Sequence, residues 1–186
     1  KHDQFSRRTF MAGTAAAAMT AKTYAQASGA NGRLNVGFIG CGGMAGSHIK
    51  SLLHIRKDEN LRIAAVCDVY KSRANGFRDQ TTADGAEAPV VTQDYREVLA
   101  MKDIDYVVIA TPEHSHAYLT LAALDAGKHV YCEKPMTHNI DESQAVVKKV
   151  NETGLKMQVG VQGMADDSYE SAFRAIKAGK LGPVVQ

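Results

Sequence analysis

Short apolar runs alternate with amphipathic stretches along most of the chain. Six apolar runs predict β-strands at residues 36–39, 61–67, 90–91, 104–110, 128–132 and 156–160. Between them, apolar residues recur three or four positions apart and predict helices at residues 44–53, 70–78, 94–99, 111–127 and 139–151. The run at 104–110 is almost continuously apolar, as in a parallel sheet that helices cover on both faces.

Residues typical of helix ends mark three of these helices. Asp94 is predicted to cap the third helix. Thr111 is predicted to cap the fourth, with Pro112 at its first position. Asn139 and Gly154 are predicted to flank the fifth.

Strands that alternate with helices, without an internal repeat, imply right-handed crossovers and an open, mostly parallel sheet. Six strands match the doubly wound dinucleotide-binding (Rossmann) fold, an α/β fold with strand order 3-2-1-4-5-6. Ligands of such sheets bind at the carboxyl ends of the strands, near strands 1 and 4. We therefore expect the residues that follow these strands to share one crevice.

The chain has 186 residues, 45% of them hydrophobic, which is enough for one core. We expect a signal peptide at 1–27, a linker at 28–33, a dinucleotide-binding domain at 34–160 and the incomplete start of a second α/β domain at 161–186. Within the last segment, residues 169–176 predict a helix and residues 182–186 the first part of a strand. Because a single strand is not stable alone, we expect the chain to be the front part of a longer protein.

The first residues resemble an export signal. Ser6–Met11 matches the twin-arginine pattern through Arg7 and Arg8, a short alanine-rich stretch follows, and Ala25–Ala27 offers small residues for cleavage. We therefore expect a periplasmic or otherwise exported protein that the twin-arginine export machinery recognises. The alternative is an N-terminal arm that contains two adjacent arginines by chance.

The charge balance argues against two classes of partner. The leader carries a net charge of +3, so the formal charge of +2 for the whole chain becomes −1 without it. No basic patch indicates nucleic acid binding. The apolar stretch of the leader is too short for a stable membrane anchor, which needs roughly 20 residues.

A cluster of glycines follows the first predicted strand. Gly40 can form the tight turn, Gly42 lets backbone N–H groups approach a pyrophosphate, and Ala45 or Gly46 lets the next helix pack closely. The phosphate would lie at the helix N-terminus, near Gly43 and Met44, where unpaired N–H groups favour negative charge. A nucleoside triphosphate-binding loop requires Gly-Lys-Ser/Thr, which is absent here.

Asp68 ends the second predicted strand, where an acid would bind the ribose hydroxyls of a dinucleotide. This carboxylate would repel a 2′-phosphate, which predicts NAD as the cofactor. Lys71 and Arg73 follow closely and could accept that phosphate, so NADP is the alternative.

Polar residues also follow the fourth and fifth strands. Thr111, Pro112 and Glu133 should face the same crevice as the glycines. Lys134 would place a cation there, where it could orient a hydroxyl group and stabilise alkoxide charge; a solvated lysine paired with Glu133 is the alternative. The three cysteines and seven histidines show no spacing typical of a metal site, so we expect no metal.

Four segments together resemble the glucose–fructose oxidoreductase and inositol dehydrogenase family (Gfo/Idh/MocA): residues 36–46, 94–99, 110–116 and 127–135. The resemblance extends from about Leu34 onward, and exported members of the family also have twin-arginine leaders. It implies a nicotinamide cofactor in the first domain. It also implies a second α/β domain that forms the substrate site, often forms an oligomer interface, and usually supplies an acid/base Asp or His.

The resemblance also implies roles for individual residues. Lys134 matches the lysine that lies between nicotinamide and substrate and takes part in catalysis, and His116 matches a histidine expected at the nicotinamide end, although a capping or surface role fits it equally. Tyr131 and His138 are taken as structural. The complete candidate cofactor-binding set is Gly40, Gly42, Gly43, Met44, Ala45, Asp68, Thr111, Pro112, His114, Glu133 and Lys134.

Three functions follow from this interpretation. The favoured one is an NAD(P)-dependent oxidoreductase that transfers a hydride to or from a sugar, polyol or sugar derivative, in a full-length protein expected to be a homo-oligomer. The second is a glycosidase that oxidises its sugar transiently and recycles NAD. The third is a nucleotide-binding module without chemistry.

Overall fold

The computed structural model describes residues 33–162, 166–180 and 182. The export signal, most of the linker and residues 183–186 of the predicted last strand therefore lie outside the described residues. Within the described part, no helix is long and apolar enough to cross a membrane.

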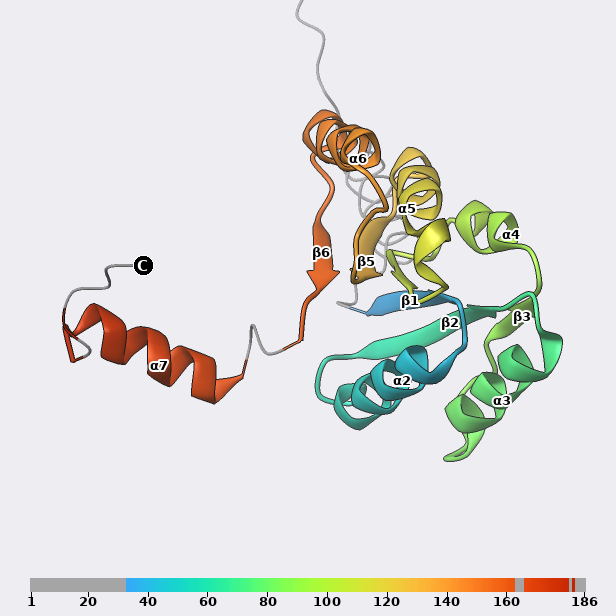
Figure 1. Ribbon diagram of the computed structural model, residues 1–186. Coiled ribbons are helices and arrows are strands. Elements are labelled where there is room, and N and C mark those ends of the chain that lie inside the picture. The colour runs from blue at the N-terminus through green and yellow to red at the C-terminus, as the bar shows by residue number, and fades with distance from the viewer. Residues whose placement is uncertain (1–32, 163–165, 181, 183–186) are drawn as a thin grey trace, which may run out of the picture.

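One six-stranded parallel sheet forms the centre of the fold (Figure 1). Its strands are β1 (Leu34–Ile39), β2 (Leu61–Cys67), β3 (Val90–Thr92), β4 (Tyr106–Ile109), β5 (His129–Glu133) and β6 (Met157–Gly160). The order β3-β2-β1-β4-β5-β6 confirms the predicted doubly wound sheet. All five strand pairs are parallel, so the carboxyl ends of the strands lie along one edge.

Helices cover both faces of this sheet (Figure 1). They are α2 (Gly43–Ile55), α3 (Lys71–Thr82), α4 (Tyr95–Ala100), α5 (His116–Asp125) and α6 (Ile140–Thr153), and a further helix, α7 (Asp167–Lys177), follows β6. Helices α2 and α3 lie on one face, where Phe38 and Ile49 belong to the core. Helices α4 and α5 lie on the other, where Ile109 and Leu119 are buried. No residue of α7 is buried.

Three of the predicted helix ends are confirmed in atomic detail. The Asp94 carboxylate accepts a hydrogen bond from Arg96 N at 2.9 Å, and the Asn139 side chain accepts one from Glu142 N at 2.9 Å. Gly154 ends α6 in the left-handed conformation, with φ of 66°.

Two other predictions about helix ends are wrong. Helix α3 continues to Thr82, past the predicted end at residue 78, and in this last turn Thr81 is buried and its hydroxyl donates to Phe77 O. Thr111 does not cap α5. Its hydroxyl oxygen instead lies 2.6 Å from Ser115 Oγ, and a 3₁₀ turn at Glu113–Ser115 separates Pro112 from the helix.

Candidate functional site

The loop after β1 has two kinds of glycine. Gly40 has φ of +93°, and a Cβ there would lie 2.7 Å from the backbone of Ala110 and Thr111, so only glycine fits against the end of β4. Gly42 has an extended backbone that any residue can adopt, and a Cβ there meets nothing within 4 Å. Gly42 therefore keeps space open beside the first turn of α2 without being needed for the fold.

The neighbouring positions of α2 differ in their exposure. Gly43 is exposed and has open space around it, and Met44 is 43% exposed. Ala45 is fully buried, so it packs α2 on the sheet and does not contact a ligand. A Cβ on Gly46 would meet nothing within 4 Å, which identifies Ala45 as the small residue needed for close helix packing.

Asp68 connects the ends of β1 and β2. Its Oδ2 accepts a hydrogen bond from Cys41 N at 2.8 Å, and its Oδ1 accepts one from Tyr70 N at 2.8 Å. The side chain is largely buried, and its carboxylate oxygens have lone pairs left for further donors. Asp68 thus holds the glycine loop in place and still lies at the crevice.

The carboxyl edge of the sheet contains two adjoining cavities. The β2-side cavity, about 330 Å³, is lined by Gly40, Asp68, Val69 and His114, among others. The β5-side cavity, about 270 Å³, is lined by Met44, Glu133, Lys134 and His116, among others. Ala110, Thr111 and Pro112 line both, so the cavities form one crevice across the ends of β1, β2, β4 and β5.

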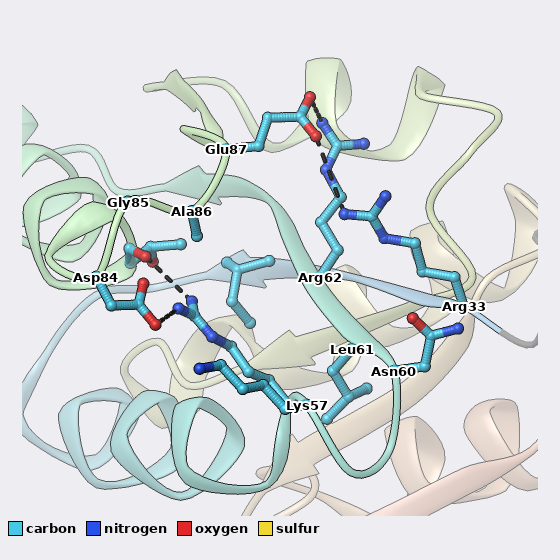
Figure 2. Close-up of a pocket in the computed structure, with 12 residues that line it drawn as sticks. Arg33, Lys57, Asn60, Leu61, Arg62, Asp84, Gly85, Ala86 and Glu87 are labelled. Carbon is cyan, nitrogen blue, oxygen red and sulfur yellow. Dashed lines mark hydrogen bonds and ion pairs between the residues drawn. The ribbon is translucent and has the colours of Figure 1, made fainter.

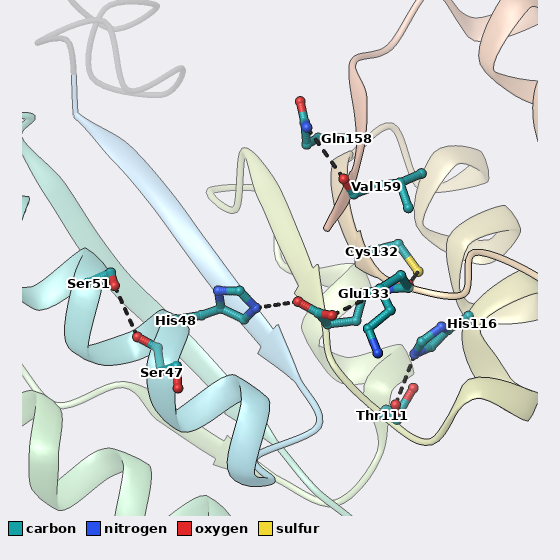
Figure 3. A network of polar contacts seen from close by, with 10 residues as sticks. Ser47, His48, Ser51, Thr111, His116, Cys132, Glu133, Gln158 and Val159 are labelled. Carbon is teal, nitrogen blue, oxygen red and sulfur yellow. Dashed lines mark hydrogen bonds and ion pairs between the residues drawn. The ribbon is translucent and has the colours of Figure 1, made fainter. Parts of the chain in front are cut away.

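Glu133 ends β5 and Lys134 follows it, and the two side chains have different surroundings. Glu133 is buried, and its Oε1 lies 2.6 Å from His48 Nε2 on α2 (Figure 3). Its Oε2 accepts a hydrogen bond from the backbone N of Lys134 at 3.3 Å. Among the described residues, no carboxylate lies within 4.0 Å of Lys134 Nζ, so the ammonium is not paired with Glu133. The peptide bond between Lys134 and Pro135 is cis.

Two residues that support Glu133 were not identified from the sequence. His48 lies on α2, and its ring also packs edge-on against Tyr131, with the ring centroids 5.0 Å apart. Gly160 on β6 leaves room for this cluster, because a Cβ there would lie 2.6 Å from Tyr131 Oη and 2.8 Å from Glu133 Oε1. Burial, and then the Glu133 carboxylate, raise the pKa of Tyr131.

His116 is almost completely buried at the start of α5. Its Nδ1 lies 2.7 Å from Pro135 O and its Nε2 lies 2.9 Å from Thr111 O. Both ring nitrogens are therefore bound to the backbone. The expectation of a catalytic His116 needs correction, since no ring nitrogen is free to exchange a proton with a substrate.

Neither the cysteine thiols nor the potential metal ligands among the described residues show features typical of a reactive or metal-binding site. Burial raises the pKa of Cys41 and of Cys67 to about 12 and that of Cys132 to about 11, so these thiols stay protonated at neutral pH. In the part of the chain that the structure describes, no group of three or more potential metal ligands lies together.

A cavity of about 400 Å³ lies beside the start of β2 and has a different character (Figure 2). It is rich in arginine, but each arginine has a carboxylate partner: Arg56 pairs with Asp84, and both Arg33 and Arg62 pair with Glu87. The three guanidinium charges are thus paired within the chain.

Comparisons with known proteins agree with a dinucleotide-binding fold. Residues 34–161 match the model of the oxidoreductase family with an NAD-binding Rossmann fold. The chain belongs to the Gfo/Idh/MocA family. The match confirms the family resemblance, and the NAD-binding description of the family confirms the predicted cofactor.

Relatives within the family include inositol dehydrogenases. The chain is 35% identical to the inositol 2-dehydrogenase of Rubrobacter xylanophilus over 154 residues, which are 82% of this chain and 42% of that protein. It is 34% identical to the NAD⁺-dependent scyllo-inositol 2-dehydrogenase of Bacillus subtilis, over 77% of this chain and 40% of that protein. The chain thus spans about two fifths of the length of these relatives.

A solved structure gives the same fold. The scyllo-inositol dehydrogenase of Lactobacillus casei, with bound NAD(H) and scyllo-inositol, superposes with a TM-score of 0.72 at 26% identity. The match covers 81% of this chain and 42% of that one.

Proposed function

We propose that this chain holds NAD in the crevice and forms the cofactor-binding part of an oxidoreductase that acts on a CH–OH group of a polyol, sugar or sugar derivative. The observation that carries the proposal is the position of Lys134, an ammonium without a carboxylate partner among the described residues, in the cavity that adjoins the glycine loop. The family match and the names of the inositol-dehydrogenase relatives support the substrate class.

The residues present fit such a cofactor. Gly42 leaves an open space at the amino end of α2, where unpaired N–H groups would bind the pyrophosphate. Asp68 has lone pairs left to accept hydrogen bonds from the ribose hydroxyls. NAD, when bound, supplies the hydride acceptor for oxidation of an alcohol.

Lys134 would act on the substrate oxygen. Its ammonium has three donors and no acceptor, so it can orient a hydroxyl and stabilise the negative charge that develops on the oxygen. It cannot take the hydroxyl proton while it is itself protonated. We expect the base for that proton, an Asp or His, to come from a second domain.

Two measurements test the proposal. Calorimetric titration of NAD into the chain should show binding, and the absence of heat and of any spectroscopic change would contradict it. With the complete protein, NADH absorbance should rise on addition of myo-inositol, scyllo-inositol or another polyol of a small panel. Release of an aglycone from a glycoside without accumulation of NADH would favour the glycosidase instead, and NAD binding without either reaction would favour a binding module.

We also propose that the protein is exported by the twin-arginine route. The twin-arginine pattern at Ser6–Met11 supports this. An exported protein also needs to bind its nicotinamide cofactor before it leaves the cytoplasm, and this route carries folded proteins. Replacing Arg7 and Arg8 together by lysine should retain the precursor in the cytoplasm. Unchanged export of this double variant would contradict the proposal.

A further inference from the structure

His116 lies between the two backbone segments that border the reacting end of the crevice. Thr111 follows β4 and Pro135 follows β5, and the ring of His116 contacts the carbonyl oxygen of each, at 2.9 Å and 2.7 Å. Lys134 is the residue before Pro135. One side chain therefore fixes the distance between the end of β4 and the segment that carries the proposed catalytic lysine.

The chemistry of these two contacts restricts the proton state of the ring. A carbonyl oxygen can only accept a hydrogen bond, and a neutral imidazole has only one N–H group to donate. In a neutral ring, one nitrogen would direct its lone pair at a carbonyl oxygen less than 3 Å away. Both contacts are favourable only when both ring nitrogens carry protons.

We propose that His116 is a buried imidazolium that positions Lys134, by donating to Thr111 O and Pro135 O together. The positioning role rests on the proposed function, which gives Lys134 its part in the reaction. The proton state of His116 does not depend on that function. His116 is then a positioning residue, because its nitrogens contact the backbone and not the reacting atoms.

The surroundings can support a buried positive charge. Glu133 is a buried carboxyl group that lines the same cavity as His116, and a carboxylate beside a buried cation reduces the cost of burying it. The other charged or titratable groups around this cavity are Lys134 directly after β5, Glu113 on the 3₁₀ turn, His138, which pairs with Glu113 at 3.3 Å, and His48, which contacts Glu133. Ser115 braces the same turn by donating to Pro112 O at 2.7 Å.

Nitrogen NMR of the histidine rings tests the proton state directly, without cofactor or substrate. In the ¹⁵N-histidine-labelled chain at about pH 7.5, exposed histidines are mostly neutral and show one unprotonated nitrogen, since their usual pKa is about 6.5. We expect one ring with two protonated nitrogens to remain in H48Q, which removes the other candidate beside Glu133. That signal should be absent from H116Q.

Each outcome decides the matter. If every ring in both the wild-type and the H48Q spectra shows an unprotonated nitrogen, the proposal is wrong, even if H116Q does not fold. If H116Q folds, its NAD dissociation constant should change less than threefold, and kcat of the complete protein should fall about tenfold or more. An unchanged kcat would overturn the positioning role. Failure of NAD to bind the wild type would instead contradict the proposed function. It would not affect the conclusion on the proton state of His116.

Discussion

The β2-side and β5-side cavities share a wall, yet the chain builds them in different ways. On the β2 side, Asp68 receives hydrogen bonds from backbone N–H groups, and the glycines set the shape of the loop. On the β5 side, side chains from distant elements meet: His48 of α2 contacts Glu133 of β5, and His116 of α5 contacts Pro135. The β2 side is therefore suited to hold a ligand in one place, whereas the contacts on the β5 side hold the segment that carries Lys134.

This difference predicts that variants on the two sides will separate cofactor binding from hydride transfer. The largest effect should come from Gly42→Val, because its side chain would occupy the open space beside the first turn of α2. NAD affinity should fall at least 100-fold in calorimetry, with the thermal unfolding midpoint little changed. Gly46→Val is the matched control, since Gly46 also has open space around it. Equal losses in both variants would show that the loop uses Gly46 for the phosphate as well.

The next largest effect concerns Lys134→Ala on the β5 side. If the ammonium acts on charge that develops during hydride transfer, kcat/KM of the complete protein should fall by a factor on the order of 10²–10³. The NAD dissociation constant should barely change. Lys148→Ala on the exposed face of α6 is the control and should change neither quantity. Weaker NAD binding with normal single-turnover hydride transfer would make Lys134 a cofactor ligand instead.

A smaller effect is expected when Asp68 loses its charge. Asp68→Asn should weaken NAD binding roughly 10-fold, in line with the loss of a charged hydrogen-bond acceptor, and should improve the binding of NADP. The ratio of the two dissociation constants measures this change. Equal or tighter NADP binding by the wild type would show that Lys71 or Arg73 accepts the 2′-phosphate.

The smallest effect should come from Gly160→Ala, which leaves Lys134 itself intact. The added methyl group would press on Tyr131 and Glu133, so the pair must shift, at a cost on the order of 1 kcal/mol in the free energy of unfolding. We expect kcat to fall a few-fold and NAD affinity to stay the same. Gly76→Ala, where the methyl group meets open space, is the control. A loss of NAD affinity in Gly160→Ala would mean that the two cavities are coupled.

Features that depend on neighbouring residues could be predicted from the sequence. Alternating strands and helices predict a parallel sheet, six strands match the order of the doubly wound fold, and the caps at Asp94 and Asn139 follow from local hydrogen bonds. The loop around Gly40 and the acid at Asp68 also belong to short, recognisable patterns. Most features of the β2 side could therefore be predicted from the sequence.

The β5 side depends on contacts between distant residues. His48 and Glu133 lie 85 positions apart, and His48 also fits the apolar stripe of α2, so nothing local identifies the pair. The need for glycine at 160 arises only from Tyr131 and Glu133 on the adjacent strand. His116 lies in a recognisable motif, but only the structure shows that both of its nitrogens contact the backbone.

A crystal structure of the chain with NAD would test the division of the crevice most directly. We expect the adenosine ribose to contact Asp68, the pyrophosphate to lie beside Gly42 at the start of α2, and the nicotinamide ring to enter the β5-side cavity near Lys134. Density for NAD in the opposite direction, or in the arginine-rich cavity beside the start of β2, would contradict it.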